Sequence, residues 1–396
     1  MSVWSSLVGQ DAAIAQLSEA AVGARAIIAG RGGGRASDEA RSMSHAWLIT
    51  GPPGSGRSVA ARAFAAALQC TGEEPGCGAC PGCRTTMART NADVVFAATE
   101  TSIINVDTAR SLVLQAQSSP SQGLWRVIVV EDADRLGESG ANALLKAIEE
   151  PPEHTVWLLC APSPEDMIAT IRSRCRHLGL RIPTAAAVAD LLVREGVATP
   201  DVALEAARAA QSHIGLARAL ARDPQMRERR RAIITAPASV RSVGEAVMAA
   251  DRLLETAKAQ ADAQVSERNA REKAELLRQL GMDEGESTTK ASRTMLRQLE
   301  EDQKRRSKRA LTDAIDRALI DLLAIYRDVL MVQVGGDGEL INTDLSDLVH
   351  EIAQDSTPRQ TLVRVDHIET ARKRLVSNGN PLLVLEDMAI SLRPQA

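Results

Sequence analysis

The sequence predicts an α/β domain built on a doubly wound parallel sheet, followed by an all-helical region. In the first 182 residues, five short apolar runs alternate with helical segments, which is the pattern of a parallel sheet whose connections are helices. From Pro183 onward the apolar residues recur at helical spacing instead. The composition agrees, because 44% of the residues are hydrophobic but only 2% are aromatic, which favours aliphatic, helix-rich cores.

The elements of the predicted sheet come in a regular order. An alanine-rich helix lies within residues 5–29, and a connection rich in glycine, arginine and serine follows at residues 30–44. The run at 125–130 is apolar apart from Arg126 and ends in acidic residues, as expected of a buried parallel strand. Strands are expected at 46–49, 93–96, 125–130, 155–160 and 177–181, with helices at 59–68, 106–117 and 141–150 between them, the last one stopped by Pro151-Pro152.

The second half is predicted to be helical throughout. Six apolar residues between 311 and 329 share one helical face, which indicates a packed helix. We therefore expect three domains, at residues 1–182, 183–240 and 241–396. The helical segments expected in the second half are short ones within 184–220, a basic stretch at 227–231, a long charged helix over 243–280 that is broken at 281–286, and further helices within 340–392.

A glycine-rich loop follows the first predicted strand and opens the next helix. Its glycines Gly51, Gly54 and Gly56 allow backbone N–H groups to turn toward a polyphosphate, and the helix N-terminus adds a favourable dipole. Ser58 stands where the G-x-x-x-x-G-K-[ST] pattern places the hydroxyl ligand of Mg²⁺. Arg57 stands where the pattern has lysine, and its wider, planar guanidinium can still neutralise phosphate. We therefore expect a site for ATP and Mg²⁺ with weak or no hydrolysis of its own.

Two acidic residues, Glu131 and Asp132, follow the third predicted strand. In nucleoside triphosphatases of this architecture, an Asp at this place holds Mg²⁺ and the following Glu polarises the attacking water. Here the order is reversed. An Asp in the second position reaches about 1.5 Å less than a Glu, and such a displacement of a base slows a reaction strongly. The strand end is expected to bind an ion but to catalyse poorly.

Four of the six cysteines lie within fourteen residues and predict a metal site. Cys70, Cys77, Cys80 and Cys83 include two overlapping Cys-x₂-Cys steps, which suit tetrahedral thiolate ligation of Zn²⁺. No open coordination position with a neighbouring base is evident, so the expected zinc is structural. The other two cysteines, Cys160 and Cys175, are expected to be packing residues.

The net charge of −4 gives no overall signature of nucleic-acid binding. A local basic run at 304–309 has five cations in six positions, but Glu300, Glu301 and Asp302 precede it. A solvated helix of mixed charge is the favoured interpretation, and a zinc-bearing nucleic-acid module is an alternative. No run of 18 apolar residues and no leader are present, so we expect a cytoplasmic protein.

Three stretches resemble the clamp-loader subunits of bacterial DNA polymerase III, which are members of the AAA+ superfamily. They are the glycine-rich loop with the four cysteines behind it, the run from Ala141 to Pro152, and the run from Thr170 to Cys175. The resemblance implies an AAA+ core with a zinc-module insertion at 1–182, a helical lid at 183–240 and an all-α collar at 241–396. It also implies that Arg218 is the sensor 2 arginine of the lid, and that Arg174 is an arginine finger.

The departures from the family pattern distinguish two kinds of subunit. Motor subunits (gamma/tau) have the lysine, the Asp-Glu order and a hydroxyl at sensor 1, whereas this chain has Arg57, Glu131-Asp132 and Ala161-Pro162. The Ser-Arg-Cys motif around Arg174 is kept. The combination resembles the delta-prime subunits, whose finger acts on the ATP of a neighbouring subunit. The implied partners are the delta and gamma/tau subunits of a hetero-pentamer, the sliding clamp and primer–template DNA, and the alternative is an ATP-hydrolysing gamma/tau-type motor subunit.

Overall fold

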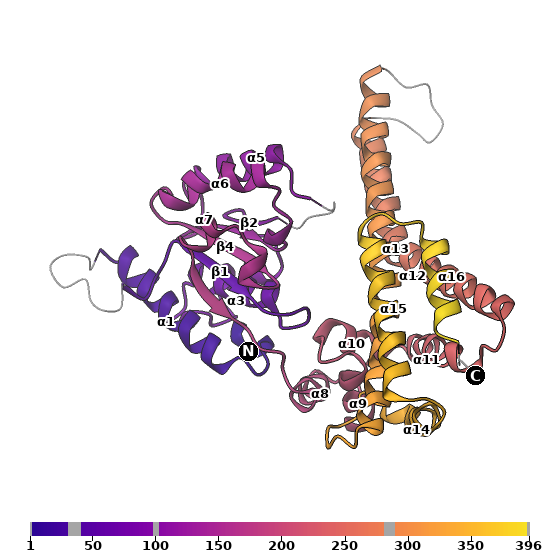
Figure 1. Ribbon diagram of the computed structural model, residues 1–396. Helices are drawn as coiled ribbons and strands as arrows, with labels where there is room; N and C mark the ends of the chain where they lie inside the picture. Colours follow the sequence, from indigo (N-terminus) through magenta and orange to yellow (C-terminus); the bar gives the residue numbers. More distant parts are fainter. Residues whose placement is uncertain (1, 31–40, 98–102, 281–289, 394–396) are drawn as a thin grey trace. The chain divides into compact units, whose positions relative to one another are not determined.

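The computed structural model divides the chain into two compact units, Met1–Ala221 and Arg222–Ala396 (Figure 1). It describes residues 2–30, 41–97, 103–280 and 290–393. Most of the connection expected at 30–44 and all of the break expected at 281–286 lie outside these residues. Each unit is considered by itself.

The first unit contains a five-stranded sheet in which every described pairing is parallel. The strand order is β2-β3-β4-β1-β5, so the chain crosses over the sheet in both directions. The predicted doubly wound α/β sheet is confirmed. The strands are β1 (Ala46–Thr50), β2 (Val94–Ala97), β3 (Arg126–Val130), β4 (Thr155–Ala161) and β5 (Arg176–Gly179).

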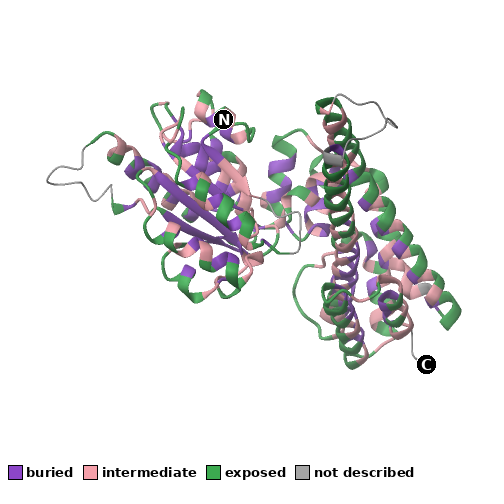
Figure 2. Cartoon of the chain, turned by 90° about the horizontal axis from the view of Figure 1, so that it is seen from above, coloured by how far each residue is buried: buried purple, intermediate pink, exposed green. Residues whose placement is uncertain are grey.

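Helices cover both faces of this sheet, and the buried strands between them form its core (Figures 1 and 2). Successive side chains of a strand point to opposite faces of the sheet, so strand β3 contributes to both cores. Val127 and Val129 belong to the core beneath one set of helices. Ile128 and Val130 belong to the core beneath the other set. The first set comprises α1 (Asp11–Ile28) and α3 (Arg57–Leu68), and the second comprises α5 (Val106–Ala116), α6 (Glu138–Glu149) and the short α7 (Ala169–Arg172).

A buried carboxylate anchors the loop that leads into β3. Asp93 is fully buried and accepts hydrogen bonds from the N–H groups of Ser121 (2.7 Å), Gln122 (2.8 Å) and Gly123 (2.6 Å). The Ser121 hydroxyl donates a fourth bond at 2.9 Å. Burial alone would raise the pKa of Asp93, but these hydrogen bonds outweigh it and hold the pKa below its usual range. Asp93 therefore stabilises the fold in its ionised form.

Replacing Asp93 with alanine is expected to lower the free energy of unfolding by about 3 kcal/mol at neutral pH, because buried donors lose their acceptor. A carboxyl whose pKa is lowered by folding contributes fully above its unfolded pKa of about 3.9 and loses that contribution as the pH falls through the folded value. The difference between wild type and variant should therefore be constant from neutral pH down to about pH 5 and shrink below about pH 4. Urea unfolding at several pH values measures it. The exposed Asp107→Ala is the control and should change stability little.

The segment expected to form a lid is divided between the two units. Helices α8 (Ala185–Arg194), α9 (Pro200–Ala209) and α10 (Ile214–Arg222) follow the sheet, and the first unit ends within α10. Helix α11 (Pro224–Ser239) belongs to the second unit instead. Its buried Arg230 donates to Asp321 at 3.1 Å and to Asn342 at 2.6 Å. These hydrogen bonds join α11 to the other helices of the second unit.

All regular elements among the described residues of the second unit are helices, as predicted. The apolar face expected between 311 and 329 lies in its core, where Ile315, Leu319 and Val329 are completely buried. None of the described helices is long and apolar enough to cross a membrane. The remaining helices are α12 (Val243–Gln279), α13 (Lys290–Gln333), α14 (Ser346–Gln354), α15 (Pro358–Val376) and α16 (Pro381–Ser391).

Helices α12 and α13 lie side by side and are joined by a polar layer (Figure 1). Arg306 donates to Asn269 at 2.7 Å and to Glu272 at 2.8 Å, and Gln303 donates to the Asn269 carbonyl at 2.9 Å. Within the basic run at 304–309, Arg305 and Arg309 also pair with acids of their own helix, at 3.3 and 3.6 Å. These ion pairs favour the interpretation of the run as a mixed-charge helix face.

Candidate nucleotide and metal sites

The glycine-rich loop connects β1 to α3, as predicted. Gly54 and Gly56 both have φ near +90°, a left-handed conformation that favours glycine. A Cβ atom on Gly54 would also lie 2.9 Å from the backbone of His213, at the start of α10. Helix α3 begins directly after Gly56, so its free N–H groups lie at the loop. The buried hydroxyl of Ser55 has no hydrogen-bond partner among the described residues, which fits a loop shaped for a polar ligand.

The two residues after the glycines occupy the first turn of α3. Ser58 is half-buried there, where its hydroxyl is available to a bound phosphate or cation. The Arg57 guanidinium donates a hydrogen bond to the Gly51 carbonyl, so this cation is bound to the backbone of its own loop. A lysine ammonium would be a freer point charge at this position.

The first acidic residue after β3 is already paired. Two nitrogens of Arg89 contact the two carboxylate oxygens of Glu131, at 2.6 and 3.4 Å, and the Glu131 side chain is only 12% exposed. Asp132 begins the short helix η2 (Ala133–Arg135). Burial raises the pKa of Asp134, and the charge of Asp132 adds to this effect, so the acids at this strand end repel one another. No motif or spacing in the sequence indicates Arg89 as a partner of Glu131.

The N-terminal segment is joined to the loop through a buried glutamine that the sequence analysis did not single out. Gln10 donates to the carbonyl of Arg181 at 2.6 Å and to that of Ser55 at 3.3 Å. Its own side-chain oxygen accepts from the N–H of Arg181 at 3.2 Å. Gln10 therefore fixes the glycine loop against the chain that leaves β5.

Arg174 is exposed and lies just after α7. Its guanidinium pairs with Glu149 and donates to the Thr170 carbonyl at 2.7 Å. The Arg174 and Glu149 side chains are 38% and 39% exposed, and exposed pairs of this kind contribute only about 0–1 kcal/mol. The arginine can therefore leave Glu149 for a stronger anionic partner at low cost.

Arg218 lies on α10 and pairs with Glu195. The two contacts are 2.8 and 2.9 Å long, from Nη2 to Oε1 and from Nε to Oε2. In this structure its hydrogen bonds are to the end of α8 and not to the glycine loop. A role at a bound nucleotide would require this ion pair to open.

The four cysteines come together as predicted. Their sulfur atoms all lie within 4.8 Å of one another, and the Cys70 and Cys80 sulfurs are 3.8 Å apart. A tetrahedral ion with Zn–S bonds of about 2.3 Å requires sulfurs about 3.8 Å apart, so the cluster fits Zn²⁺. The sulfurs of Cys77 and Cys80 accept backbone N–H groups at 3.4–3.5 Å, which stabilises thiolates.

The pKa values within the cluster point in different directions. Burial raises the pKa of Cys83. Cys80 is also subject to burial, but hydrogen bonds from the backbone of Cys83 and Thr71 outweigh it and lower its pKa to about 6. Outside the cluster, burial raises the pKa of Cys160 and of Cys175 to about 12, as expected of neutral packing thiols.

Comparison with known proteins finds similarity in the N-terminal part of the chain. Residues 35–184 match the family model described as DNA polymerase III, delta subunit. The chain is 36% identical over 180 residues to DNA polymerase III subunit delta' of Pseudomonas aeruginosa, covering 44% of this chain and 52% of that protein. It is 34% identical over 170 residues to subunit gamma/tau of Mycobacterium tuberculosis, covering 41% of this chain and 29% of that protein. Over this part, the chain is therefore similar to DNA polymerase III subunits named delta' and gamma/tau.

A second delta' subunit gives a match of similar extent. The match to subunit delta' of Escherichia coli is 35% over 191 residues and spans 47% of this chain and 57% of that protein. The chain thus spans between about a third and somewhat over half of these relatives. Among solved structures, a gamma subunit-related protein of Thermotoga maritima aligns over 88% of this chain and 93% of its own, with 16% identity and a TM-score of 0.43.

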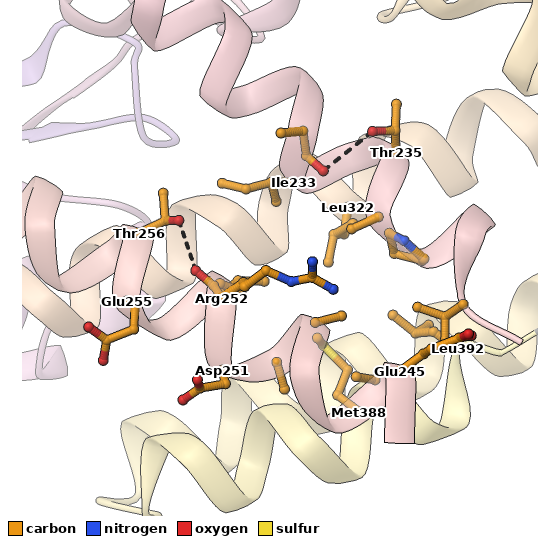
Figure 3. A pocket seen from close by; sticks show the side chains of 18 of the residues that line it. Ile233, Thr235, Glu245, Asp251, Arg252, Glu255, Thr256, Leu322, Met388 and Leu392 are labelled. Carbon is orange, nitrogen blue, oxygen red and sulfur yellow. Dashed lines mark hydrogen bonds between the residues drawn. The ribbon is translucent and has the colours of Figure 1, made fainter. Parts of the chain in front are cut away.

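A cavity of about 650 Å³ lies in the second unit, among α11, α12, α13 and α16 (Figure 3). Apolar side chains such as Ile233, Leu322 and Met388 form much of its lining, and Arg252 extends into it. It contains none of the predicted site residues of the first unit. Its acids are spread around the opening, with Glu245 on one side and Asp251 and Glu255 on the other, so the lining offers no set of groups arranged for catalysis.

Proposed function

We propose that this chain is the delta-prime-type stator subunit of a DNA polymerase III clamp loader. In that role it assembles in the cytoplasm with delta and gamma/tau subunits into a hetero-pentamer. The complex binds ATP, opens the sliding clamp, admits primer–template DNA and releases the closed clamp after hydrolysis. The match to the family model and the similarity to subunits named delta' and gamma/tau support this proposal.

The observation that carries the stator assignment is the Arg89–Glu131 ion pair. Gly51, Gly54, Gly56, Arg57 and Ser58 are the residues that would hold the phosphates of ATP, with Glu131 and Asp132 on the Mg²⁺ side. In an active nucleotide site, Mg²⁺ held by such acids would withdraw charge from the phosphates and so ease their cleavage. Because the Glu131 carboxylate is committed to Arg89, the site's own hydrolytic capacity is weak or absent.

Arg174 supplies the activity that the chain's own site lacks. Its exposed guanidinium can turn from Glu149 to the ATP of the neighbouring motor subunit and stabilise the charge of the transition state in trans. Arg218 is the sensor 2 arginine, held by Glu195 until the lid engages a nucleotide. The cysteine cluster holds a structural Zn²⁺.

An ATP-hydrolysing gamma/tau-type motor subunit is the second candidate. The intact shape of the glycine loop and the 34% identity to a gamma/tau subunit favour it. The two functions differ in the effect of Arg57→Ala on ATP hydrolysis by the reconstituted complex in the presence of clamp and DNA. For a stator, we expect the rate to stay within about twofold of wild type, which is less than 0.5 kcal/mol. A fall of tenfold or more, about 1.4 kcal/mol, would identify a motor subunit.

A further inference from the structure

We propose that Arg89 occupies the place of the Mg²⁺ ion at Glu131. The segment that contains the four clustered cysteines, residues 70–83, which we call the cysteine module, holds Arg89 in this place. The inference rests on the proposed function, because it explains why the site of a stator subunit does not use metal. Arg89 is then the residue that determines which form of nucleotide the glycine loop accepts. A nucleotide bound here is bound without a divalent cation.

The contact between Arg89 and Glu131 is built from several elements. Arg89 follows the helix α4 (Pro81–Met87) and has a φ of +60°, which ends the helix and redirects the chain. Its N–H bonds the Thr86 carbonyl at 3.0 Å, so its backbone is fixed. Its guanidinium carbon lies 4.9 Å from the centre of the Phe96 ring of β2, next to the carboxylate at the end of β3.

A second arginine adds positive charge at the same carboxylate. Arg62 lies one turn beyond Ser58 on α3, and its Nε is buried without a hydrogen-bond partner among the described residues. Burial lowers the pKa of Arg62, and the nearby charge of Arg89 lowers it further. The negative charge of Glu131 acts in the opposite direction and raises this pKa. Two guanidinium groups therefore act on one carboxylate. A divalent cation that entered at Glu131 would meet two guanidinium groups beside that carboxylate, and it would have to displace Arg89 to reach the carboxylate oxygens that Mg²⁺ requires.

The cysteine module determines where Arg89 lies. Helix α4 has only seven residues, which is too short to be stable alone. Its N-cap is Cys80 and its first turn contains Cys83, so two of the four cluster residues begin the helix that Arg89 ends. Gly82 lies so close to the Gln69 carbonyl that a Cβ atom would be only 2.0 Å from the oxygen, which fixes the helix against the end of α3. The metal site therefore acts on Glu131 through α4.

The test is a titration of the full chain with a fluorescent ADP analogue, once with excess EDTA and once with millimolar Mg²⁺. We expect wild-type affinity to differ by less than about twofold between the two conditions. Arg89→Ala frees Glu131 and should bind at least about tenfold more tightly with Mg²⁺ than without it. Arg89→Lys keeps the positive charge and should behave like wild type.

The matched control is Arg84→Ala, which removes an exposed arginine of the same helix. This variant should bind the nucleotide as wild type does, with and without Mg²⁺. Tighter wild-type binding with Mg²⁺, or an Arg89→Ala variant that gains no Mg²⁺ dependence or binds no nucleotide, would overturn the inference. Thermal unfolding verifies that the Arg89→Ala variant is folded. The stator role is tested separately, because it depends on hydrolysis by the complex and on Arg174.

Discussion

Replacing Arg174 with alanine is expected to slow ATP hydrolysis at the neighbouring subunit's site by about 10³-fold or more in the reconstituted complex. The guanidinium is exposed, and its tie to Glu149 is weak enough to exchange for a phosphate. A finger stabilises charge that develops only in the transition state, so the loss should appear in the rate of hydrolysis and not in ATP binding. Single-turnover hydrolysis with clamp and primer–template DNA measures the rate at the affected site.

Two further variants separate a finger from a structural arginine. Arg172→Ala removes an exposed arginine two residues away, whose guanidinium bonds only the Pro164 carbonyl among the described contacts, and should leave the rate near that of wild type. Glu149→Gln removes the charge that holds Arg174 and should not reduce the rate. If Arg174→Ala hydrolyses ATP as fast as wild type in an intact pentamer, the chain does not act in trans, and the stator proposal fails.

The fold could be predicted from the sequence because its main signals are local. The runs at 46–49 and 155–160 are apolar apart from Thr155, which is the pattern of short strands buried on both faces. The predicted ends of helices were less accurate where a helix begins with polar residues. Helix α6 begins at Glu138, three residues earlier than predicted, because its first turn has no apolar residue before Ala141. The division of the expected lid segment before α11 could not be predicted, because α11 is joined to the second unit by Arg230. The two partners of Arg230 are 91 and 112 residues away in the sequence.

The site could be predicted only in its local parts. The glycine loop and the cysteine cluster have fixed spacings, and both come together in the structure. The ion pair of Glu131 joins residues 42 positions apart, and that of Arg218 joins residues 23 apart. No spacing rule connects such residues, because their contact depends on how whole elements pack. A single arginine after a metal module is indistinguishable by sequence from a solvated one.

Removing one ligand of the cysteine cluster is expected to have the largest effect on the structure of the N-terminal domain. Structural Zn²⁺ sites contribute on the order of 10 kcal/mol in small peptides. The module around this cluster has little apolar core of its own, so Cys83→Ser should lose the metal and unfold residues 70–89 locally. Zinc content per chain and proteolytic cleavage within the module measure both effects. We expect one equivalent of Zn²⁺ in wild type and much less than one in the variant.

The control for this prediction is Cys160→Ala, since Cys160 is completely buried but lies outside the cluster. It should keep its zinc and lose only about 1 kcal/mol of stability. Arg25 bonds the carbonyls of Cys70, Gly72 and Glu73 at 2.5–3.0 Å, so part of the loop will stay attached to α1 even without metal. Helix α4 begins at two of the cysteines, Cys80 and Cys83, so its first turn depends on the metal. Loss of zinc should therefore release Arg89 from Glu131, and the Cys83→Ser chain should gain the same Mg²⁺ dependence of nucleotide binding as Arg89→Ala.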